Sequence, residues 1–327
     1  MIDRRSMKTW NLFVLAVAVL AVVIVHAAPA LAPSESKTPA PSLAANEGRT
    51  PAPALKEPRS PAPRPAAPRT IVFCAPGYPG DTVQAQPTMD AFAKALAAAA
   101  GASAGSLGAI YYETAQPGLD HMQKPDAALA LVPLAFYVEY GRQAGLRPRL
   151  QVVGDGGATG IWSLVAKKGS IASPAALAGW EIAGREGYAK SFVLGPALGG
   201  YGPLPADIKV TANARSRSLL RRAAAGEKLA VFLDGPGADA IKTLPFAADL
   251  EIVARSKPLP ASLICTIENH LPSADTEALL KALSRLHERP DAAEVLKTMQ
   301  VKRFEPVEPA AVPAAAPVGA TGVGPGK

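Results

Sequence analysis

Short apolar runs alternate with stretches of helical periodicity throughout residues 70–308. Thr70–Ala75, Ala127–Val132 and Leu229–Leu233 are rich in Ile, Val, Leu and Phe and have the length of buried strands. Between the first two runs, Gln86–Ala100 places its apolar residues at helical spacing. This alternation predicts an α/β fold with mostly parallel sheets.

Two loop-like segments, Gly154–Gly157 and Ser256–Pro260, divide this pattern. After the second segment, only one strand and two helices are expected, which are too few to fold alone. We therefore expect the chain to return to the first body. The sequence predicts lobe 1 from residues 70–158 with 257–308 and lobe 2 from residues 159–256. Two crossing strands would form a hinge, with a cleft between the lobes.

The two ends of the chain differ in composition from this central part. Residues 1–32 combine a basic start, the apolar run Leu12–Val25 and the small residues Ala30–Ala32, which is typical of a secretory signal peptide. A retained membrane anchor is the alternative. Residues 33–69 are rich in Pro and Ala, which predicts a disordered linker or a stalk. We expect residues 309–327 to form a disordered tail.

The positive charge of the chain lies mainly outside the predicted lobes. The net charge is +7, but residues 70–308 contain 24 Lys and Arg against 23 Asp and Glu. A basic composition that comes from the ends gives no indication of a nucleic-acid-binding face. We expect no nucleic-acid partner.

The central part lacks sequence motifs for catalysis or metal binding. His121, His270 and His287 do not stand near Cys, Asp or Glu residues at metal-ligand spacing. A phosphate-binding loop with Gly-Lys-Ser/Thr is not present, and the Gly-x-Ser-x-Gly stretch at Gly101–Gly105 connects a predicted helix to a predicted strand rather than a strand to a helix, as a catalytic serine turn requires. We therefore expect a protein that is not an enzyme and that has no metal and no cofactor.

Three stretches carry a family resemblance. They are VFCAPGYPGDTVQAQPTMDAFAKALA (72–97), GATGIWSLVAKKGSI (157–171) followed by PAALAGWEIAG (174–184), and EIVARSKPLPASLICTIENHLP (251–272). They resemble bacterial periplasmic solute-binding proteins of the phosphate/phosphonate branch, which serve ABC importers. The resemblance implies a two-lobed type II periplasmic-binding-protein-like fold with a two-strand hinge, and a small ligand held between the lobes.

The loop after the first predicted strand is the lobe 1 part of the expected ligand site. Ligands of open α/β sheets bind beyond the carboxyl ends of the strands. Glycines let the backbone approach a ligand, and free N–H groups at a helix start favour an anion. The candidate contacts are Tyr78, Gly80, Asp81, Thr82 and Gln84. The alternative is that Asp81 or Thr82 only caps the following helix.

Lobe 2 offers a second group of candidates. Arg185 and Lys190 could neutralise an anion, and Tyr188 could stack or donate a hydrogen bond. The resembled branch holds the anionic head group at a Ser/Thr-rich turn, of which only Ser191 is present here, so the ligand identity stays open. Asp234 resembles a wall residue of that family, with helix capping as the alternative. The predicted lobe 2 contacts are the hinge residue Thr159, Tyr188, Lys190, Ser191 and Asp234.

The favoured function is solute capture in the periplasm. We expect an exported, monomeric protein that closes its hinge on a small ligand and delivers it to an ABC permease or a membrane sensor. A phosphate- or phosphonate-like anion is one candidate ligand. Two alternatives stay open: an interaction protein that kept the fold without transport, and an enzyme built on the same two lobes.

Cys74 and Cys265 are the only cysteines. The resemblance implies that one strand separates theirs in the lobe 1 sheet, which places the two backbones about 9–10 Å apart. A disulfide needs an approach closer than about 7 Å. We therefore predict two buried free thiols.

Overall fold

The computed structural model describes residues 68–268 and 270–317, and all of these fall in one compact unit. The predicted signal peptide, nearly all of the predicted linker and the last ten residues of the predicted tail lie outside the described residues.

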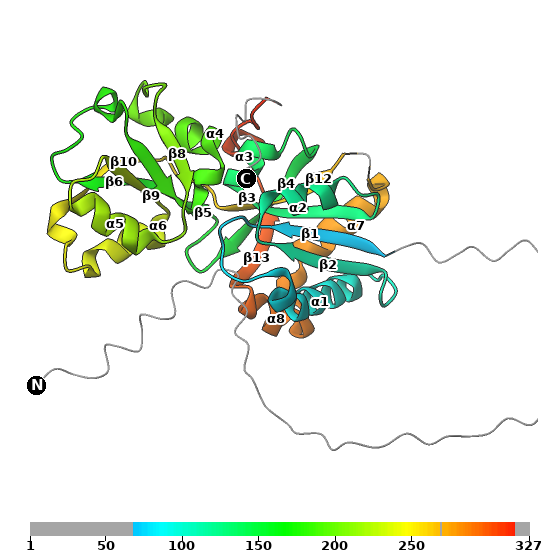
Figure 1. The fold of residues 1–327 in the computed structure, drawn as a ribbon. Coiled ribbons are helices and arrows are strands. Elements are labelled where there is room, and N and C mark those ends of the chain that lie inside the picture. Colours follow the sequence, from blue (N-terminus) through cyan, green and yellow to red (C-terminus); the bar gives the residue numbers. More distant parts are fainter. Residues whose placement is uncertain (1–67, 269, 318–327) are drawn as a thin grey trace, which may run out of the picture. The chain divides into compact units, whose positions relative to one another are not determined.

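A six-stranded sheet is the larger of the two main sheets (Figure 1). Its order is β13-β4-β12-β3-β1-β2. β1 pairs in parallel with β2 and β3, whereas β12 runs antiparallel to β3 and β4, and β13 antiparallel to β4. The strands are β1 (Arg69–Cys74), β2 (Leu107–Tyr112), β3 (Ala127–Pro133), β4 (Leu146–Gly154), β12 (Ser262–Ile267) and β13 (Val301–Pro306).

A five-stranded sheet has the order β10-β6-β9-β7-β8. β7 pairs in parallel with β8 and β9, and β6 runs antiparallel to β9 and β10. The strands are β6 (Ser163–Lys167), β7 (Glu181–Gly184), β8 (Lys209–Ala212), β9 (Leu229–Leu233) and β10 (Leu250–Arg255). Both sheets are therefore mixed rather than mostly parallel. The chain crosses between the sheets twice, from β4 to β6 and from β10 to β12. Because a chain that arrives from the other sheet needs no crossover helix, it can add an antiparallel strand.

Two short strands join the sheets. β5 (Thr159–Gly160) and β11 (Leu259–Pro260) pair antiparallel in a sheet of their own. We call the six-stranded sheet with its helices lobe 1 and the five-stranded sheet with its helices lobe 2. The predicted α/β class with a two-strand hinge is confirmed.

Helices cover both faces of the lobe 1 sheet. Ile71 and Phe73 of β1 pack in one cluster with α1, α7 and α8, while Val72 and Cys74 pack in another with α2 and α3. This division follows from the alternation of side chains along a strand. The lobe 1 helices are α1 (Thr82–Ala99), α2 (Ala115–Met122), α3 (Leu134–Tyr140), α7 (Ser273–Ser284) and α8 (Ala293–Thr298).

The longest helix of lobe 2, α5, has 9 residues, against 18 in α1 of lobe 1. Leu219, Leu220 and Ala223 of α5 pack with Val165 and Val231 from the strands of the same lobe. The helical segment that starts at Lys190 begins as α-helix and continues as one π-helical turn. These elements are α4 (Lys190–Phe192), the π-helical turn Val193–Ala197, α5 (Ser216–Ala224) and α6 (Gly235–Ala240).

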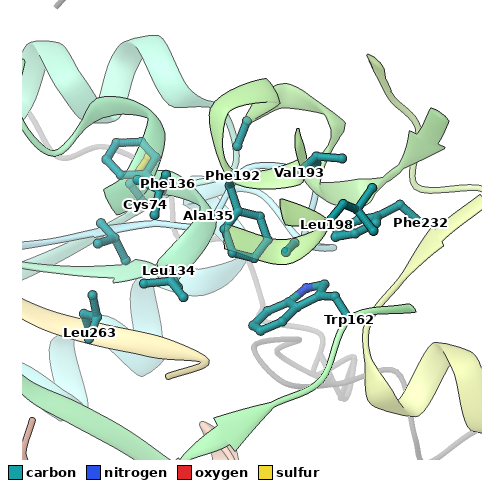
Figure 2. Close-up of a cluster of buried hydrophobic side chains, with 14 of the residues drawn as sticks. Cys74, Leu134, Ala135, Phe136, Trp162, Phe192, Val193, Leu198, Phe232 and Leu263 are labelled. Atoms are coloured by element: carbon teal, nitrogen blue, oxygen red, sulfur yellow. The ribbon is translucent and has the colours of Figure 1, made fainter. Parts of the chain in front are cut away.

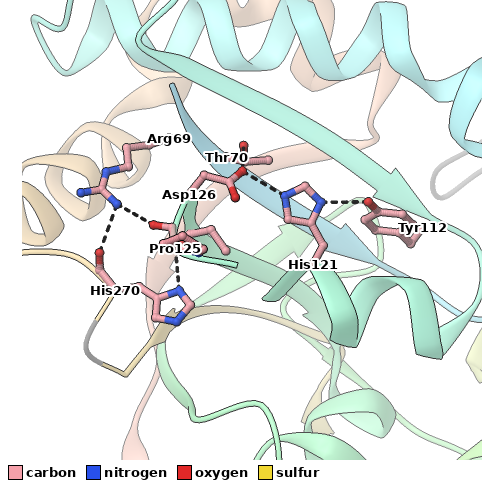
Figure 3. A network of polar contacts seen from close by, with 8 residues as sticks. Arg69, Thr70, Tyr112, His121, Pro125, Asp126 and His270 are labelled. Atoms are coloured by element: carbon pink, nitrogen blue, oxygen red, sulfur yellow. Dashed lines mark hydrogen bonds and ion pairs between the residues drawn. The ribbon is translucent and has the colours of Figure 1, made fainter. Parts of the chain in front are cut away.

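A polar network fixes α2 against the start of β1 (Figure 3). His121 Nδ1 lies 2.8 Å from Tyr112 Oη, and its Nε2 lies 3.1 Å from Asp126 Oδ2. Thr70 Oγ1 donates to the same Asp126 oxygen at 2.8 Å. His121 is buried, so these partners satisfy polar atoms that water does not reach.

The start of the expected disordered tail is ordered. Pro309–Ala311 forms a turn of 3₁₀ helix, and Val312 packs against the cluster that contains α3. Ala316 N–H donates to Val138 O at 2.7 Å. Because α3 ends two residues after Val138, this carbonyl has no partner inside the helix and accepts a bond from outside it.

Candidate functional site

The loop after β1 brings lobe 1 against lobe 2. Gly77 has φ +78°, a conformation that side chains disfavour, and a Cβ built there would lie 2.8 Å from Arg185 Cγ. Glycine is thus required both for the turn and for the close approach of Arg185. The neighbouring Tyr78 lies under Arg185, with the guanidinium carbon 4.0 Å from the ring centroid.

Asp81 and Thr82 stabilise the start of α1. Asp81 Oδ1 accepts a hydrogen bond from Gln84 N at 2.8 Å, which is the capping arrangement. Thr82 Oγ1 donates to Tyr111 O at 2.8 Å and lies 3.2 Å from Glu113 Oε2. The Gln84 side chain is exposed. The predicted contact Gly80 is likewise exposed.

Arg185 connects the loops that follow β1, β7 and β9. Its Nη2 lies 2.7 Å from Asp234 Oδ2 and 3.0 Å from Glu186 Oε1. The Arg185 side chain is 23% exposed and that of Glu186 only 6%, so the Arg185–Glu186 pair is largely shielded from water. One guanidinium therefore faces two carboxylates and one aromatic ring.

Burial and these neighbours shift the ionisation of the cluster. Burial raises the pKa of Tyr78 to about 12, although the Arg185 charge opposes the shift. Burial also raises the pKa of Tyr188 well above its ordinary value. Burial lowers the pKa of Arg185, but Glu186, Tyr78 and Asp234 together raise it by more. At neutral pH both tyrosines are protonated and Arg185 is charged.

Asp234 has two roles at the end of β9. Its Oδ1 accepts a hydrogen bond from Gly237 N at 2.9 Å and caps α6, while its Oδ2 pairs with Arg185. The sequence presented capping and a place in the site wall as alternatives. The structure shows the cap together with a position beside Arg185.

The start of α4 also meets lobe 1. Ser191 N–H donates to Oε2 of Glu139, which belongs to α3, at 2.7 Å. The adjacent Lys190 side chain is exposed. Thr159 is exposed in β5, where it pairs with Pro260 in the hinge.

An apolar contact lies beside these polar ones (Figure 2). Leu134, Ala135 and Phe136 of α3 belong to the same buried cluster as Trp162 and Phe192 of lobe 2. The Trp162 and Phe192 rings meet nearly perpendicular, with centroids 5.0 Å apart. The two lobes are therefore in direct contact next to the hinge.

The structure brings together only part of the predicted site. Tyr78 and Asp234 meet through Arg185, and Tyr188 is close enough for Tyr78 to affect its ionisation. Glu186 and Glu139 were not predicted, because a single acidic residue on a loop or helix gives no pattern that points across a cleft. Within the part of the chain that the structure describes, neither a hydrogen bond nor an ion pair joins the Arg185 cluster to Gly80, Gln84, Thr159 or Lys190.

Two surface hollows lie elsewhere on lobe 1. One has a volume of about 290 Å³ and is lined in part by Asp155, His287 and Lys302. The other, of about 380 Å³, lies between the end of α1 and α7. Neither is lined by a predicted site residue.

Sequence comparison assigns the chain to a family. A family model described as "ABC transporter, phosphonate, periplasmic substrate-binding protein" matches residues 81–312. The chain belongs to this family. Members of this phosphonate-binding family are the substrate-binding components of ABC transporters, so the chain is classed with solute-capturing proteins rather than with enzymes. No sequence among the curated proteins matches the chain.

Two solved structures of one protein share the fold of this chain. XAC2383 from Xanthomonas citri, bound to chloride ion, has a TM-score of 0.55 and 15% identity, covering 74% of this chain and 93% of its own. Its ATP-bound structure has a TM-score of 0.56 and 14% identity, covering 74% and 92%. A binding protein of an ABC phosphonate transporter from Pseudomonas aeruginosa has a TM-score of 0.49 and 15% identity, covering 75% and 83%.

Among residues 68–268 and 270–317, no helix is both long and apolar enough to span a membrane.

Proposed function

We propose that this chain is an exported solute-binding protein that captures a small solute between its lobes for an ABC importer or a membrane sensor. The contact of Arg185 in lobe 2 with Tyr78 in lobe 1 carries the proposal. It joins the loop after β1 to the loop after β7, on two bodies linked by a two-strand hinge. Membership of the phosphonate-binding family supports the same function.

The solute would bind at the Arg185 cluster. Arg185 offers a planar donor group, and Tyr78 and Tyr188 offer protonated hydroxyls at neutral pH. A phosphate- or phosphonate-like anion would take the place of Asp234 at Arg185, where the Asp234 side chain is 31% exposed and within reach of a solute. A ligand that contacts both lobes stabilises the closed arrangement and shifts the population toward it.

Export and delivery complete the proposal. The basic and apolar pattern of residues 1–32 supports secretion to the periplasm. Action there as a monomer is part of the proposal. The family description supports an ABC permease as the receiving partner. The membrane sensor rests on the sequence interpretation alone.

One observation favours a second function. The polar groups at the lobe junction already have partners in the protein: Arg185, which contacts Tyr78 of lobe 1, is paired with Asp234 and Glu186 of its own lobe, and Ser191 N–H is paired with Glu139 of lobe 1. A cleft filled by its own side chains fits an interaction protein that kept the fold without transporting a small molecule. The second candidate would bind no solute with measurable affinity.

Titration calorimetry with inorganic phosphate and methylphosphonate distinguishes the two functions. Under solute capture, wild-type protein binds at least one of them, and Arg185→Ala weakens binding by about tenfold or more. Arg185→Lys retains the charge but loses the planar donor geometry, and we expect weakened binding there also. Arg142→Ala, which removes an exposed arginine of lobe 1, serves as the control and should bind like wild type.

Thermal melting of each variant separates lost binding from lost folding. If the folded wild-type protein gives no heat with either anion, capture of these anions is wrong and the interaction protein is favoured. If Arg185→Ala melts like wild type and still binds with unchanged affinity, the Arg185 cluster is not the site.

A further inference from the structure

Glu139 is a buried carboxylate that belongs to one lobe and bonds to the other. It lies in α3 of lobe 1 and is only 4% exposed. Its Oε2 accepts the backbone N–H of Ser191 in lobe 2 at 2.7 Å. Its Oε1 is buried without a hydrogen-bond partner. A carboxylate in this state is costly to bury, so packing alone does not account for it.

The rest of α3 shows what packing alone would select. Leu134, Ala135, Phe136 and Val138 are apolar and at most 2% exposed. An apolar residue at position 139 would continue this face without a buried charge. The carboxylate is therefore explained by what it meets across the lobe junction rather than by α3 itself.

The Ser191 N–H that Glu139 contacts is suited to binding an anion. Ser191 is the second residue of the helical segment that runs from Lys190 to Ala197, and its N–H is among those without a partner inside the helix. The charge of Lys190 also favours the ionised form of Glu139. A backbone N–H at a helix start, next to a lysine, could equally donate to an anionic group of a solute.

We propose that Glu139 is a built-in anion that occupies the Ser191 N–H in place of a solute anion, and that it thereby determines which solutes the cleft accepts. In the protein without solute, this contact joins α3 to α4 and stabilises the closed lobes. Competition with solute rests on the function proposed above, whereas the contact between the lobes does not. Solutes with an anionic group must displace Glu139 or bind only through Arg185.

Hydrogen exchange of the Ser191 amide in solute-free protein tests the contact. Glu139→Ala removes the acceptor, and we expect exchange at Ser191 to be about tenfold faster or more. Glu139→Gln retains an acceptor oxygen, so Ser191 should stay protected as in wild type. Asp120→Asn, which alters an exposed lobe 1 carboxylate, is the matched control and should leave exchange unchanged. Unchanged exchange in a folded Glu139→Ala protein overturns the proposal.

Calorimetry with inorganic phosphate and methylphosphonate tests the competition. Glu139→Ala frees the donor and removes a competing charge, so we expect about tenfold tighter binding of at least one anion than in wild type. Glu139→Gln removes the charge but leaves the donor occupied, and its affinity should lie between the two. If Glu139→Ala melts far below wild type, the Glu139→Gln comparison decides alone: affinity equal to wild type overturns the competition.

The outcomes separate this inference from the proposed function. Wild type and Glu139→Ala binding an anion equally well would overturn the role of Glu139 and leave solute capture intact. Binding by Glu139→Ala alone supports Glu139 as the competitor. No binding by either protein, together with faster exchange at Ser191, overturns both the competition and the capture of these anions.

Discussion

Trp162 and Phe192 meet edge to face, with ring centroids 5.0 Å apart and planes at 80°. Trp162 precedes β6, at the entry to lobe 2, and Phe192 ends α4. Both belong to the buried cluster that includes α3 of lobe 1 (Figure 2). The pair therefore anchors the apolar contact beside the hinge.

Truncation of Phe192 should destabilise the protein. Phe192 is fully buried, so Phe192→Ala leaves a cavity next to Trp162 and should lower the free energy of unfolding by about 3–5 kcal/mol. Urea unfolding followed by tryptophan fluorescence measures the change. Val83→Ala, at a side chain that is 83% exposed, is the control and should change little. Equal midpoints for the two variants would contradict the packing described here.

The strands of the fold were predictable because most of them are buried apolar runs. β3 and β9 have buried residues at nearly every position, and their bounds follow the sequence pattern to within one residue. β13 was not predicted, because its exposed positions carry charge in the sequence Val-Lys-Arg-Phe-Glu-Pro. α2 was missed because Pro117 and Gly118 stand within it and favour a turn in sequence-based reasoning.

The candidate site was less predictable than the fold. The sequence suggested that Tyr78 and Asp234 follow strands, which places them at strand ends. It did not indicate that Arg185 would contact Tyr78 or that Glu139 would bond to Ser191, since both contacts depend on how the two lobes pack together. Pairings across lobes are set by tertiary packing, to which local periodicity is insensitive.

Ionisation of Tyr78 should reveal its contact with Arg185. Its pKa is raised by burial from 10 to about 12, so the stability it contributes is complete below pH 10 and is lost as the pH rises to about 12. The Arg185 charge lowers this pKa, so Arg185→Gln should raise it further. Ultraviolet absorbance titration measures the tyrosine pKa values, with Tyr78→Phe identifying the signal. A downward shift in Arg185→Gln would contradict the cation–ring geometry.

Glu139 should make stability depend on pH. Burial raises its pKa above the ordinary value of 4.5, against the effects of Ser191 and Lys190. The charge of Glu139 in turn contributes to the raised pKa of Tyr140 on the same helix. Because burial makes ionisation of Glu139 costlier in the folded protein than in the unfolded chain, its stabilising contribution is complete below pH 4.5 and is lost as the pH rises through the raised pKa. Glu139→Gln should therefore gain stability relative to wild type as the pH rises from 4.5 through that raised pKa.

Unfolding free energies of both proteins across this range measure the effect. A constant difference between the two curves would show that Glu139 does not titrate with an altered pKa in the folded protein.

Replacement of His121 should destabilise lobe 1, where α2 packs against the start of β1. His121 connects Tyr112 to Asp126, so His121→Ala removes the partner of Tyr112 Oη and one partner of the half-buried Asp126 carboxylate, and should cost about 1–3 kcal/mol (Figure 3). Chemical unfolding gives the value. His287→Ala, at an exposed histidine of the same lobe, should lie within about 0.5 kcal/mol of wild type. A similar small effect at His121 would mean that the network adds little to stability.

Cys74 and Cys265 should be unreactive in the folded protein and should both react after unfolding. They lie on β1 and β12, with β3 between them, and both are buried free thiols as the sequence analysis predicted. Burial raises the pKa of each thiol, so the nucleophilic thiolate is scarce at neutral pH. Thiol titration without reductant should give no fast reaction in native protein and two groups in denaturant. Fewer than two groups in denaturant would reveal a disulfide, which requires the backbones to come closer than two strand spacings of about 9–10 Å allow.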